Sequence, residues 1–368
     1  MAEYTIAVLA GDGIGPEVTA EAVGALRAVE RRSSHTFTLR EALVGQAAIA
    51  VEGEAISDAT MALCQASDAV LFGAVGGAGV GRPDAKAQPE NALFRLRKEL
   101  ALFANVRPVR PLPALLGAST IKRETLRGVD MVVVRELTGG LYYGKPSEIR
   151  EDSAGAVEAG GASAVDTMVY SEAEIERIVR YACELARGRR QRVTSVDKAN
   201  VLSCSRLWRR VAERVARDYP DVTLRHLLVD SCAMGLIRQP RDFDVIVTEN
   251  MFGDILTDEA SMLAGSMGML PSASLGTRMT AHGRFGLYEP IHGTAPDITG
   301  QGKANPLAAI LSAALLLRYS LGLTRAAEAV ESAVASVIAA GYRTPDIATA
   351  RGTIVSTGEM GAAVAERI

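Results

Sequence analysis

Short apolar runs alternate along this chain with longer stretches of helical periodicity, and this alternation limits its possible folds more than any other feature. The apolar runs with the length of buried strands are residues 4–10, 69–74, 131–135, 192–196, 223–229 and 243–247. Helical spacing is found in residues 16–32, 89–102, 175–186, 205–217, 307–321 and 325–339. Strands that alternate with helices are typical of α/β proteins, and 368 residues suffice for two domains. We therefore predict an α/β fold.

Composition excludes several kinds of partner. A net charge of −3, without a basic stripe interleaved with aromatic residues, argues against nucleic-acid binding. The cysteines form no Cys-x-x-Cys motif, so we expect neither a disulfide framework nor a zinc ribbon. The apolar run at residues 307–317 is too short to span a bilayer. With no secretory signal at the N-terminus, we expect a cytoplasmic protein without a membrane partner.

The turn that begins at Gly11, with sequence Gly-Asp-Gly-Ile-Gly, follows the first predicted strand and precedes a helix. It resembles the start of a dinucleotide-binding fingerprint. Pro16 stands where the third glycine of that fingerprint belongs, and no acidic residue clearly ends a second strand about twenty residues further on. We therefore predict a turn required for packing rather than a Rossmann-type nucleotide site.

Asp254 and Asp258 lie four residues apart, on one face of a predicted helix. Two carboxylates at this spacing repel each other and cost an isolated helix about 0.2–0.5 kcal/mol. A divalent cation such as Mg²⁺ or Mn²⁺ would reverse the sign of that interaction, because hard cations prefer oxygen ligands. A solvated acidic face is the alternative, but the segment after the pair is rich in Gly, Met and Ser rather than in charge. We favour a metal site.

Arginines form a second candidate group. Arg97 lies on the amphipathic helix, Arg107 in the sequence Asn-Val-Arg-Pro, and Arg135 at the end of an apolar strand. Guanidinium groups bind carboxylates in a bidentate manner, so the three suit a substrate with two or three carboxylates. Any one of them could equally be a surface arginine. Arg135 is the exception, because the carboxyl end of a strand is where α/β proteins place their sites.

Lys198, Tyr142 and Asp230 complete the polar set. Lys198 and Asp230 each follow a predicted strand, and Tyr142 lies in a glycine-flanked turn. A lysine that is desolvated or close to other cations can act as a base, and a tyrosine can donate a proton. Alone, Lys198 or Tyr142 would more often be structural. Together with the arginines and aspartates, they suit metal-assisted oxidation of a 2-hydroxy dicarboxylate, followed by loss of CO₂.

Long motifs in the same order resemble those of the β-decarboxylating dehydrogenases, the family of isocitrate and isopropylmalate dehydrogenases. These motifs begin at Gly11 (Gly-Asp-Gly-Ile-Gly-Pro-Glu), Val134 (Val-Arg-Glu-Leu-Thr-Gly-Gly-Leu-Tyr), Val196 (Val-Asp-Lys-Ala-Asn-Val-Leu), Asn250 (Asn-Met-Phe-Gly-Asp-Ile-Leu-Thr-Asp) and Gly286 (Gly-Leu-Tyr-Glu-Pro-Ile-His-Gly-Thr-Ala-Pro-Asp). The resemblance covers almost the whole chain.

The resemblance implies a two-domain fold that is not of the Rossmann type. Residues 1–102 and 265–368 would form an NAD-binding domain that joins both termini. Residues 103–264 would form a central domain for dimerisation, metal and substrate. The Gly-, Ser- and Ala-rich piece at residues 153–165 would be a dimerising arm of that domain, although its composition also suits a linker.

The resemblance also implies roles for the polar set in a homodimer with shared active sites. Asp230, Asp254 and Asp258 would hold Mg²⁺ or Mn²⁺, and Asp230 would come from the second subunit. Lys198, also from that subunit, would be the general base, and Tyr142 would protonate the product carbon. The carboxylates of the substrate would bind to Arg97, Arg107 and Arg135, and Asp230 would also contact it.

The NAD contacts implied by the resemblance lie mostly near the C-terminus. The residues around the adenosine half would be Glu289, His292, Gly293, Ala295, Asp297 and Asn305, and Asn200 would approach the nicotinamide. Because a carboxylate accepts hydrogen bonds from ribose hydroxyls and repels a 2′-phosphate, Asp297 predicts NAD rather than NADP.

Substrate choice is expected at the start of the helix near residue 90. Glu90 would repel a third carboxylate, which disfavours isocitrate. Leu93 and Phe94, with Val201 from the other subunit, offer apolar walls for a branched alkyl group. We therefore expect oxidative decarboxylation of 3-isopropylmalate to 4-methyl-2-oxopentanoate, a step of leucine biosynthesis. A related 3-alkylmalate or tartrate is the alternative substrate, and a paralogue without catalysis is the alternative of another class.

Overall fold

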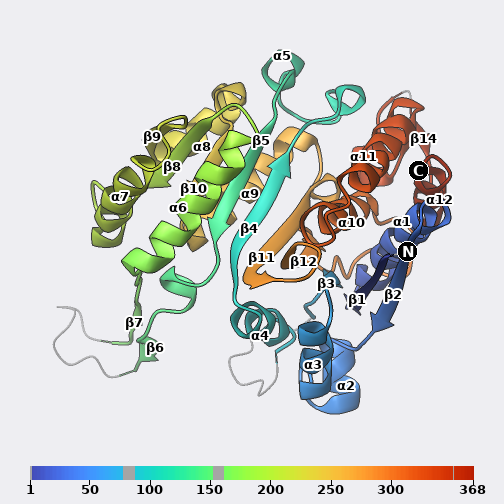
Figure 1. Cartoon of the computed structure of the whole chain (residues 1–368), viewed down its shortest axis with the longest axis horizontal. Helices are drawn as coiled ribbons and strands as arrows, with labels where there is room; N and C mark the ends of the chain where they lie inside the picture. Colours follow the sequence, from blue (N-terminus) through green and yellow to red (C-terminus); the bar gives the residue numbers. More distant parts are fainter. Residues whose placement is uncertain (1, 78–87, 152–160, 351) are drawn as a thin grey trace.

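The computed structural model describes residues 2–77, 88–151, 161–350 and 352–368. Within them, one ten-stranded sheet runs through the whole molecule (Figure 1). Its strands, in spatial order, are β2 (His35–Glu41), β1 (Ala2–Gly11), β3 (Ala69–Ala74), β12 (Arg284–Pro290), β11 (Pro271–Met279), β4 (Leu102–Val109), β5 (Met131–Glu136), β10 (Val245–Thr248), β8 (Arg192–Asp197) and β9 (Thr223–Leu228). The predicted α/β class is confirmed.

The sheet is parallel towards both edges and antiparallel in the middle. Strands β12, β11, β4 and β5 are joined by antiparallel pairs, whereas the pairs outside them are parallel. Strands β2, β1, β3, β12 and β11 come from the two end segments of the chain, and β4, β5, β10, β8 and β9 from its centre. The two groups meet where β11 pairs with β4. This order is compatible with the predicted domains, which remain a prediction because the sheet is continuous across them.

The half that contains both termini carries helices on both faces of the sheet. Alternate residues of β1 face opposite ways: Ile6 and Val8 belong to the larger hydrophobic core, and Ala7 and Leu9 to a smaller one. The larger core is covered here by α1 (Gly15–Arg31), α10 (Leu307–Tyr319), α11 (Thr324–Ala339) and α12 (Thr357–Ala365). The smaller core is covered by α2 (Gln46–Glu52), α3 (Asp58–Ala66) and α4 (Asn91–Glu99).

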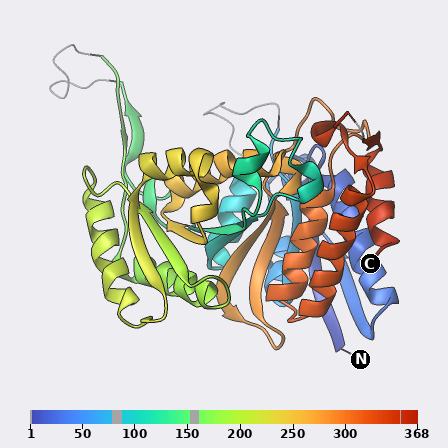
Figure 2. The same cartoon turned by 90° about the horizontal axis from the view of Figure 1, so that it is seen from above.

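The central half is covered in the same way. Helix α6 (Glu172–Arg187) packs on β5 and β10 beside α7 (Ser203–Ala216). Helices α8 (Val229–Arg238) and α9 (Asn250–Ala264) pack against each other on the opposite side of the strands (Figure 2). The remaining short elements are α5 (Arg123–Leu126), β13 (Tyr342–Arg343) and β14 (Thr353–Ile354), with 3₁₀ turns η1 (Pro113–Leu115), η2 (Gly140–Tyr142), η3 (Pro240–Asp242), η4 (Met267–Met269) and η5 (Pro345–Ile347).

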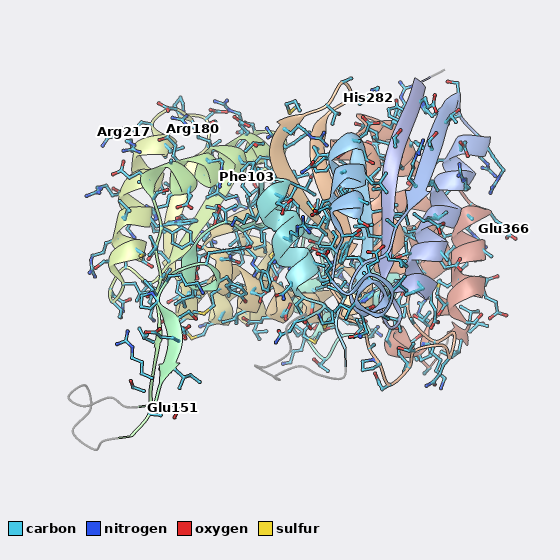
Figure 3. The ribbon with its side chains drawn as sticks, turned by 90° about the horizontal axis from the view of Figure 1, so that it is seen from below. Phe103, Glu151, Arg180, Arg217, His282 and Glu366 are labelled. Atoms are coloured by element: carbon cyan, nitrogen blue, oxygen red, sulfur yellow. The ribbon has the colours of Figure 1, made fainter. Side chains whose placement is uncertain are left out.

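A two-stranded arm projects from the central half. Strand β6 (Ser147–Arg150) pairs in antiparallel fashion with β7 (Ser163–Asp166), and every residue of β6 is exposed. Glu151 lies far out on this arm (Figure 3). Residues 163–165 of the predicted arm or linker belong to β7, and residues 153–160 lie outside the described residues. The expectation that this arm dimerises stays a prediction.

In the glycine turn after β1, other parts of the chain occupy the space next to the glycines. A side chain at Gly11 would lie 1.9 Å from the carbonyl oxygen of Ala74, and one at Gly13 would lie 2.2 Å from that of Thr294. Both glycines have positive φ, at +74° and +59°. Asp12 accepts hydrogen bonds from the backbone N–H groups of the first two residues of α2. The turn thus serves packing, in agreement with the predicted non-Rossmann fold.

Several boundaries differ from prediction, and two of the differences bear on the candidate site. The helix expected at residues 89–102 spans only Asn91–Glu99, because Ala101 has φ +50° and Leu102 begins β4. Asp230 does not end a strand, because β9 stops at Leu228 and Asp230 lies in the first turn of α8. No helix in the described part of the chain is long and apolar enough to cross a membrane.

Candidate active site

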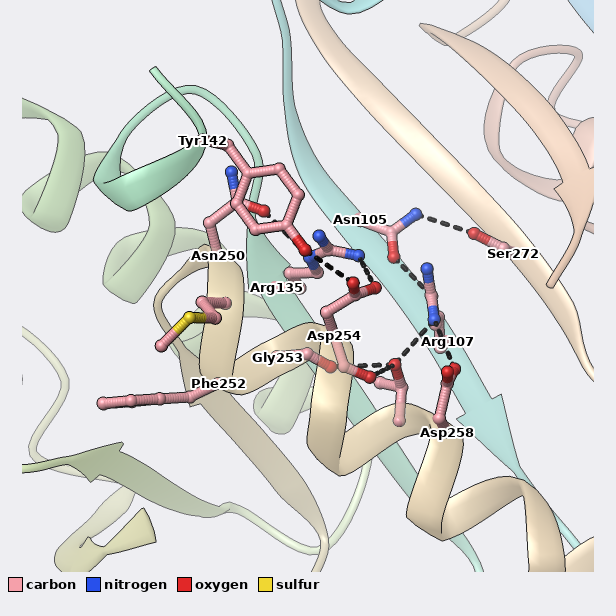
Figure 4. Close-up of polar contacts among 12 residues, drawn as sticks. Asn105, Arg107, Arg135, Tyr142, Asn250, Phe252, Gly253, Asp254, Asp258 and Ser272 are labelled. Carbon is pink, nitrogen blue, oxygen red and sulfur yellow. Dashed lines mark hydrogen bonds and ion pairs between the residues drawn. The ribbon is translucent and has the colours of Figure 1, made fainter. Parts of the chain in front are cut away.

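Asp254 lies where β5, η2 and α9 meet (Figure 4). Arg135, near the end of β5 and only 2% exposed, forms an ion pair with one oxygen of Asp254. The Tyr142 hydroxyl, carried by η2, donates a hydrogen bond of 2.7 Å to the other oxygen. The predicted proton donor, one predicted substrate arginine and one predicted metal ligand are therefore in direct contact within a single chain.

Asp258 lies one helical turn further along α9, as the spacing requires. Its nearest cation is Arg107 of β4, whose Nη1 atom lies 3.8 Å from the carboxylate. The same guanidinium donates hydrogen bonds of 2.6 Å to Thr257 Oγ1 and 2.7 Å to Asn105 Oδ1. Arg107 is buried and fixed, whereas the Asp258 side chain is 60% exposed and free to take another ligand.

The two aspartates differ in acidity. Burial raises the pKa of Asp254, but the positive charge of Arg135 and the hydrogen bond from Tyr142 outweigh burial, so its net pKa lies below the usual range. The pKa of Asp258 is raised, first by burial and then by the charge of Asp254, which Arg107 only partly offsets. Burial and the nearby Arg135 lower the pKa of Arg107 to about 10. The two aspartates are thus not equivalent: Asp254 is in contact with its counter-ion Arg135, whereas Asp258 is more distant from Arg107.

A cavity of about 170 Å³ lies beside this cluster. Its walls include residues that the sequence singled out for substrate and for NAD: Leu93, Arg97, Arg107, Glu289, His292 and Gly293. Arg97 of α4 lies 3.7 Å from Glu289 of β12. The pKa of Glu289 is raised by burial, which the positive charges of Arg97 and Arg107 partly offset.

Two buried nitrogen atoms of the cavity wall have no hydrogen-bond partner within the described part of the chain: Arg97 Nε and His292 Nε2. Buried polar groups are nearly always paired, so such atoms point to a ligand or water that completes them. Burial also lowers the pKa of His292, which favours the neutral imidazole. Both residues line the cavity, so a polar ligand bound there would lie close to them.

The residues expected to contact the alkyl group are only partly brought together. Glu90 precedes α4, Leu93 lines the cavity, and Phe94 is 38% exposed. The Phe94 ring meets Tyr143 edge-on, at 6.3 Å between centroids. Val201 lies on the Lys198 loop in the central half, and its side chain is 62% exposed. Its predicted place across a subunit boundary is not tested by one chain.

The remaining predicted NAD contacts fall in two environments. Ala295, with φ +39°, and Asp297, which is exposed, lie in the segment that follows Gly293. Asn305 is buried: its Oδ1 atom accepts from the Leu307 N–H at the start of α10, and its Nδ2 donates to Asp346. Asn305 therefore has a structural task at the edge of the predicted site.

Lys198 and Asp230 pair with each other, away from the α9 aspartates. Lys198 follows β8, and its ammonium group contacts the Asp230 carboxylate, whose pKa this hydrogen bond lowers. Asn200, also expected at the nicotinamide, is exposed on the same loop. In the described residues of one chain, no group of three or more His, Cys, Asp or Glu side chains is placed to hold a metal ion. Asp230 and the α9 pair thus do not form a triad within a single subunit.

Several polar residues of the cluster were not singled out from the sequence. Asn105 donates to Ser272 and Ser274 of β11 at 2.7 and 3.1 Å while it accepts from Arg107. Asn105 precedes Arg107 by two on a strand, a spacing that places both side chains on one face and could have revealed it. Asn250 contacts Arg135 from the start of α9. Its partner is distant in the sequence, so no local pattern indicates that contact.

The chain belongs to the isocitrate/isopropylmalate dehydrogenase family, which matches it over residues 5–364. Members of this family are β-decarboxylating dehydrogenases, and the fold agrees with solved structures of that class. An isocitrate dehydrogenase from Methylococcus capsulatus superposes with a TM-score of 0.83 at 34% identity, covering 99% of both chains. A β-decarboxylating dehydrogenase from Thermococcus kodakarensis gives 0.77 at 35% identity, over 99% of this chain and 96% of the other.

Relatives of higher sequence identity carry a more specific name. The 3-isopropylmalate dehydrogenase of Geobacillus kaustophilus is 58% identical over 360 residues, which are 98% of this chain and 94% of that protein. The 3-isopropylmalate dehydrogenase of Dehalococcoides mccartyi is 53% identical over 367 residues, covering 100% of this chain and 99% of the relative.

Proposed function

We propose that this protein catalyses the oxidative decarboxylation of 3-isopropylmalate to 4-methyl-2-oxopentanoate and CO₂, with reduction of NAD and with Mg²⁺ or Mn²⁺, in leucine biosynthesis. The observation that carries the proposal is the cavity in which Arg97 and Arg107 share one space with Glu289, His292 and Gly293, beside the α9 aspartates. Groups suited to a dicarboxylate and groups expected to contact NAD thus meet at one place.

The choice of 3-isopropylmalate rests on relatives and on the cavity wall. Proteins that are 53–58% identical over nearly the whole chain are named 3-isopropylmalate dehydrogenase, whereas the isocitrate dehydrogenase neighbour is 34% identical. Leu93 gives the cavity an apolar wall, and Phe94 lies next to it on α4. Glu90 would repel the third carboxylate of isocitrate.

The carboxylates of α9 fit a hard divalent cation. Asp254 and Asp258 are oxygen donors on one helix face, and Asp258 is largely exposed with its nearest cation at 3.8 Å. With Asp230 of the partner subunit, they would hold Mg²⁺ or Mn²⁺. When bound, the cation would polarise the oxygen on C2 of the substrate, and NAD would accept the hydride from that carbon.

The NAD site fits the residues near β12. His292 Nε2 and Arg97 Nε are buried polar atoms that a cofactor in the cavity could complete. Exposed Asp297 would accept from ribose hydroxyls and disfavour a 2′-phosphate, so we propose NAD rather than NADP. Asn200 of the partner subunit would approach the nicotinamide.

We propose a homodimer because the exposed apolar residues of α8 and α9 lie next to the incomplete site. Met234 and Ile237 of α8 are 64% and 46% exposed, and Ile255 and Met262 of α9 are 59% and 44% exposed. Such apolar side chains on adjacent helices suit burial against a second copy. A second copy placed there would bring Lys198, Val201 and Asp230 towards the α9 aspartates of the first. All cysteines are free, in keeping with a cytoplasmic enzyme.

In this dimer, each side chain has a defined chemical task. Arg97, Arg107 and Arg135 would bind the substrate carboxylates, and Arg135 would release Asp254 for its other ligands. The partner subunit's Lys198 would take the proton of the C2 hydroxyl as the hydride leaves C2. The bond between C3 and its carboxylate would then break, CO₂ would leave, and the electron pair would remain at C3. The Tyr142 hydroxyl would return a proton to C3.

A substrate panel tests the proposal. Purified protein with Mn²⁺ should form NADH from 3-isopropylmalate at a kcat/KM well above that for isocitrate, tartrate or a longer 3-alkylmalate. It should prefer NAD to NADP and lose activity in excess chelator, with recovery when Mn²⁺ is restored. A higher kcat/KM for another malate would identify that malate as the substrate and would leave the enzyme family unchanged. An absence of NADH formation with every member of the panel would overturn the proposed function.

A further inference from the structure

We infer that Asn250 is a positioning residue for this reaction, whose side-chain amide fixes Arg135 and the turn of Tyr142 in one arrangement. The inference rests on the proposed function for its kinetic readout. Asn250 is 1% exposed and lies at the first turn of α9, four residues before Asp254 (Figure 4). Nothing in the proposed chemistry requires Asn250 to touch the substrate.

The two ends of the Asn250 amide serve two different elements. Its Oδ1 atom accepts a hydrogen bond of 3.0 Å from Arg135 Nε at the end of β5. Its Nδ2 atom donates one of 3.1 Å to the carbonyl oxygen of Gly139, at the start of the turn that carries Tyr142. Only a group that accepts on one side and donates on the other can hold both. Asparagine meets that requirement, whereas an ionised carboxylate only accepts and an alkyl group does neither.

The contacts close into a ring. From Asn250, the path runs through the Arg135 guanidinium to Asp254, from Asp254 to the Tyr142 hydroxyl, and back along η2 to Gly139 and Asn250. Because Asn250 and Asp254 are one turn apart on α9, the helix holds Arg135 from two positions. The ring therefore sets Arg135 and Tyr142 relative to each other before any ligand arrives.

Gly253 shows how closely α9 approaches Arg135. A side chain at Gly253 would lie 2.6 Å from Arg135 Cγ and 2.8 Å from its Cβ. The helix start is itself anchored by buried groups, since the Asn250 N–H donates to the Tyr170 hydroxyl at 2.9 Å and Glu249 accepts from the N–H of Phe252. With the backbone fixed, Asn250 cannot move to restore a lost contact. In the sequence Asn-x-x-Gly-Asp at residues 250–254, the asparagine and the aspartate therefore bind Arg135, and the glycine allows the helix to approach it closely.

Two kinetic effects are expected from Asn250→Ala. Loss of the acceptor for Arg135 should raise KM for 3-isopropylmalate about tenfold, and loss of the donor to Gly139 should lower kcat about tenfold through Tyr142. The matched control is Ser261→Ala, which removes another buried side chain of α9; among the described residues, its hydroxyl bonds only to the helix backbone, at the carbonyl of Asp258. The control should keep both constants within about twofold of wild type.

Double-mutant cycles separate positioning from a general loss of structure. The effect of Asn250→Ala on KM should largely vanish when Arg135 is already Lys, and its effect on kcat should largely vanish when Tyr142 is already Phe. Equal losses in all backgrounds, or unchanged constants in the single variant, would overturn the inference. If Asn250→Ala fails to fold, Asn250→Asp keeps the acceptor and the shape but loses the donor. Its kcat effect should then be coupled to Tyr142→Phe in the same way.

A failure of the proposed function would be visible separately. If wild type and Ser261→Ala both form no NADH, the function is wrong, and the cycle is measured by urea unfolding instead. Asn250→Ala and Arg135→Lys should then lower the free energy of unfolding by less together than the sum of the single effects. Strict additivity would overturn the positioning role.

Discussion

Two acid–base clusters, one at α9 and one where β8 and β9 end, differ in how completely a single chain builds them. At α9, Asp254 is in contact with Arg135 and Tyr142, and Arg107 lies next to Asp258. At the other cluster, Lys198 and Asp230 contact each other, with side chains that are 28% and 53% exposed. The first cluster contains arginines that we propose bind the substrate carboxylates, and a cavity lies beside it. The second pairs the proposed base with a carboxylate, and under the proposed function it would complete the active site of a second subunit.

Under the proposed function, substrate binding and proton removal would be assigned to different surfaces of the subunit. The α9 cluster is preorganised by buried partners, so it can hold a dicarboxylate in one geometry. The Lys198 cluster is open, so it can be presented to another chain. Changes at the two clusters should therefore differ in kind: changes at α9 should alter stability as well as activity, and changes at Lys198 mainly activity.

The largest expected effect is on catalysis by Lys198→Met. Removal of a general base typically costs about 10²–10⁴-fold in rate, and we expect kcat to fall within that range. KM for 3-isopropylmalate and the thermal unfolding midpoint should change little, because the partly exposed pair with Asp230 adds little to the fold. Steady-state kinetics with NAD and Mn²⁺, together with thermal unfolding, would measure this. Full turnover by the variant would refute the assigned base.

A smaller effect is expected on stability when each cluster loses its aspartate. Asp254→Ala leaves the nearly buried Arg135 without its counter-ion, and should lower the free energy of unfolding by about 2–3 kcal/mol. This is less than for a fully buried pair, because the Asp254 side chain is 38% exposed. The matched variant Asp230→Ala should leave stability unchanged within error, since its partner Lys198 can reach water. Urea unfolding in chelator, at one protein concentration, compares them. If both variants lowered the free energy of unfolding equally, the proposed difference between the two clusters would be wrong.

The smallest expected effect concerns pH and Asp258. Its folded pKa is raised, so its ionised form destabilises the metal-free protein at pH values above that pKa, and the penalty disappears below the unfolded value of about 4. Asp258→Asn should thus gain about 0.3 kcal/mol at neutral pH and nothing in acid. Asp254 has the opposite sign: its lowered pKa gives a stabilising contribution that is lost as the pH falls through that value.

Urea unfolding of Asp258→Asn at neutral and acid pH, with chelator present, tests this. The same variant should lose stabilisation by Mn²⁺, which distinguishes a metal ligand from a surface carboxylate. A neutral-pH stability below that of wild type would contradict the raised pKa of Asp258.

The fold was predicted from the sequence where a local pattern of residues indicates a strand or a helix. Residues 69–74 form β3 as expected, and the four-residue spacing of Asp254 and Asp258 does lie on a helix. The antiparallel pair β11 and β12 was not predicted. Its first strand alternates Ser272 and Ser274 with the small Ala273 and with Leu275, so the segment is too weakly apolar to be recognised as a buried strand. Ser272 and Ser274 can be buried because Asn105 donates a hydrogen bond to each of them. Asn105 lies 167 residues away from Ser272 in the sequence.

The site was predicted in part, for the same physical reason. Arg135 could be singled out because it follows an apolar strand, and the cavity brings Leu93, Arg97 and Arg107 to Glu289 and His292. Asn250 could not be singled out, because its importance comes from partners on β5 and at Gly139 that only folding brings near. The roles assigned across subunits remain predictions, since they depend on a second chain.

The most direct test of the shared site is complementation between two inactive variants. A tagged heterodimer of Asp254→Asn with Lys198→Met has one active site with both defects and one with neither, if Lys198 acts in its partner's site. Such a heterodimer should recover about half of the wild-type kcat per dimer, whereas each parent homodimer stays nearly inactive. If Lys198 served the site of its own chain, every site would carry one defect. A heterodimer no more active than its parents would contradict the account.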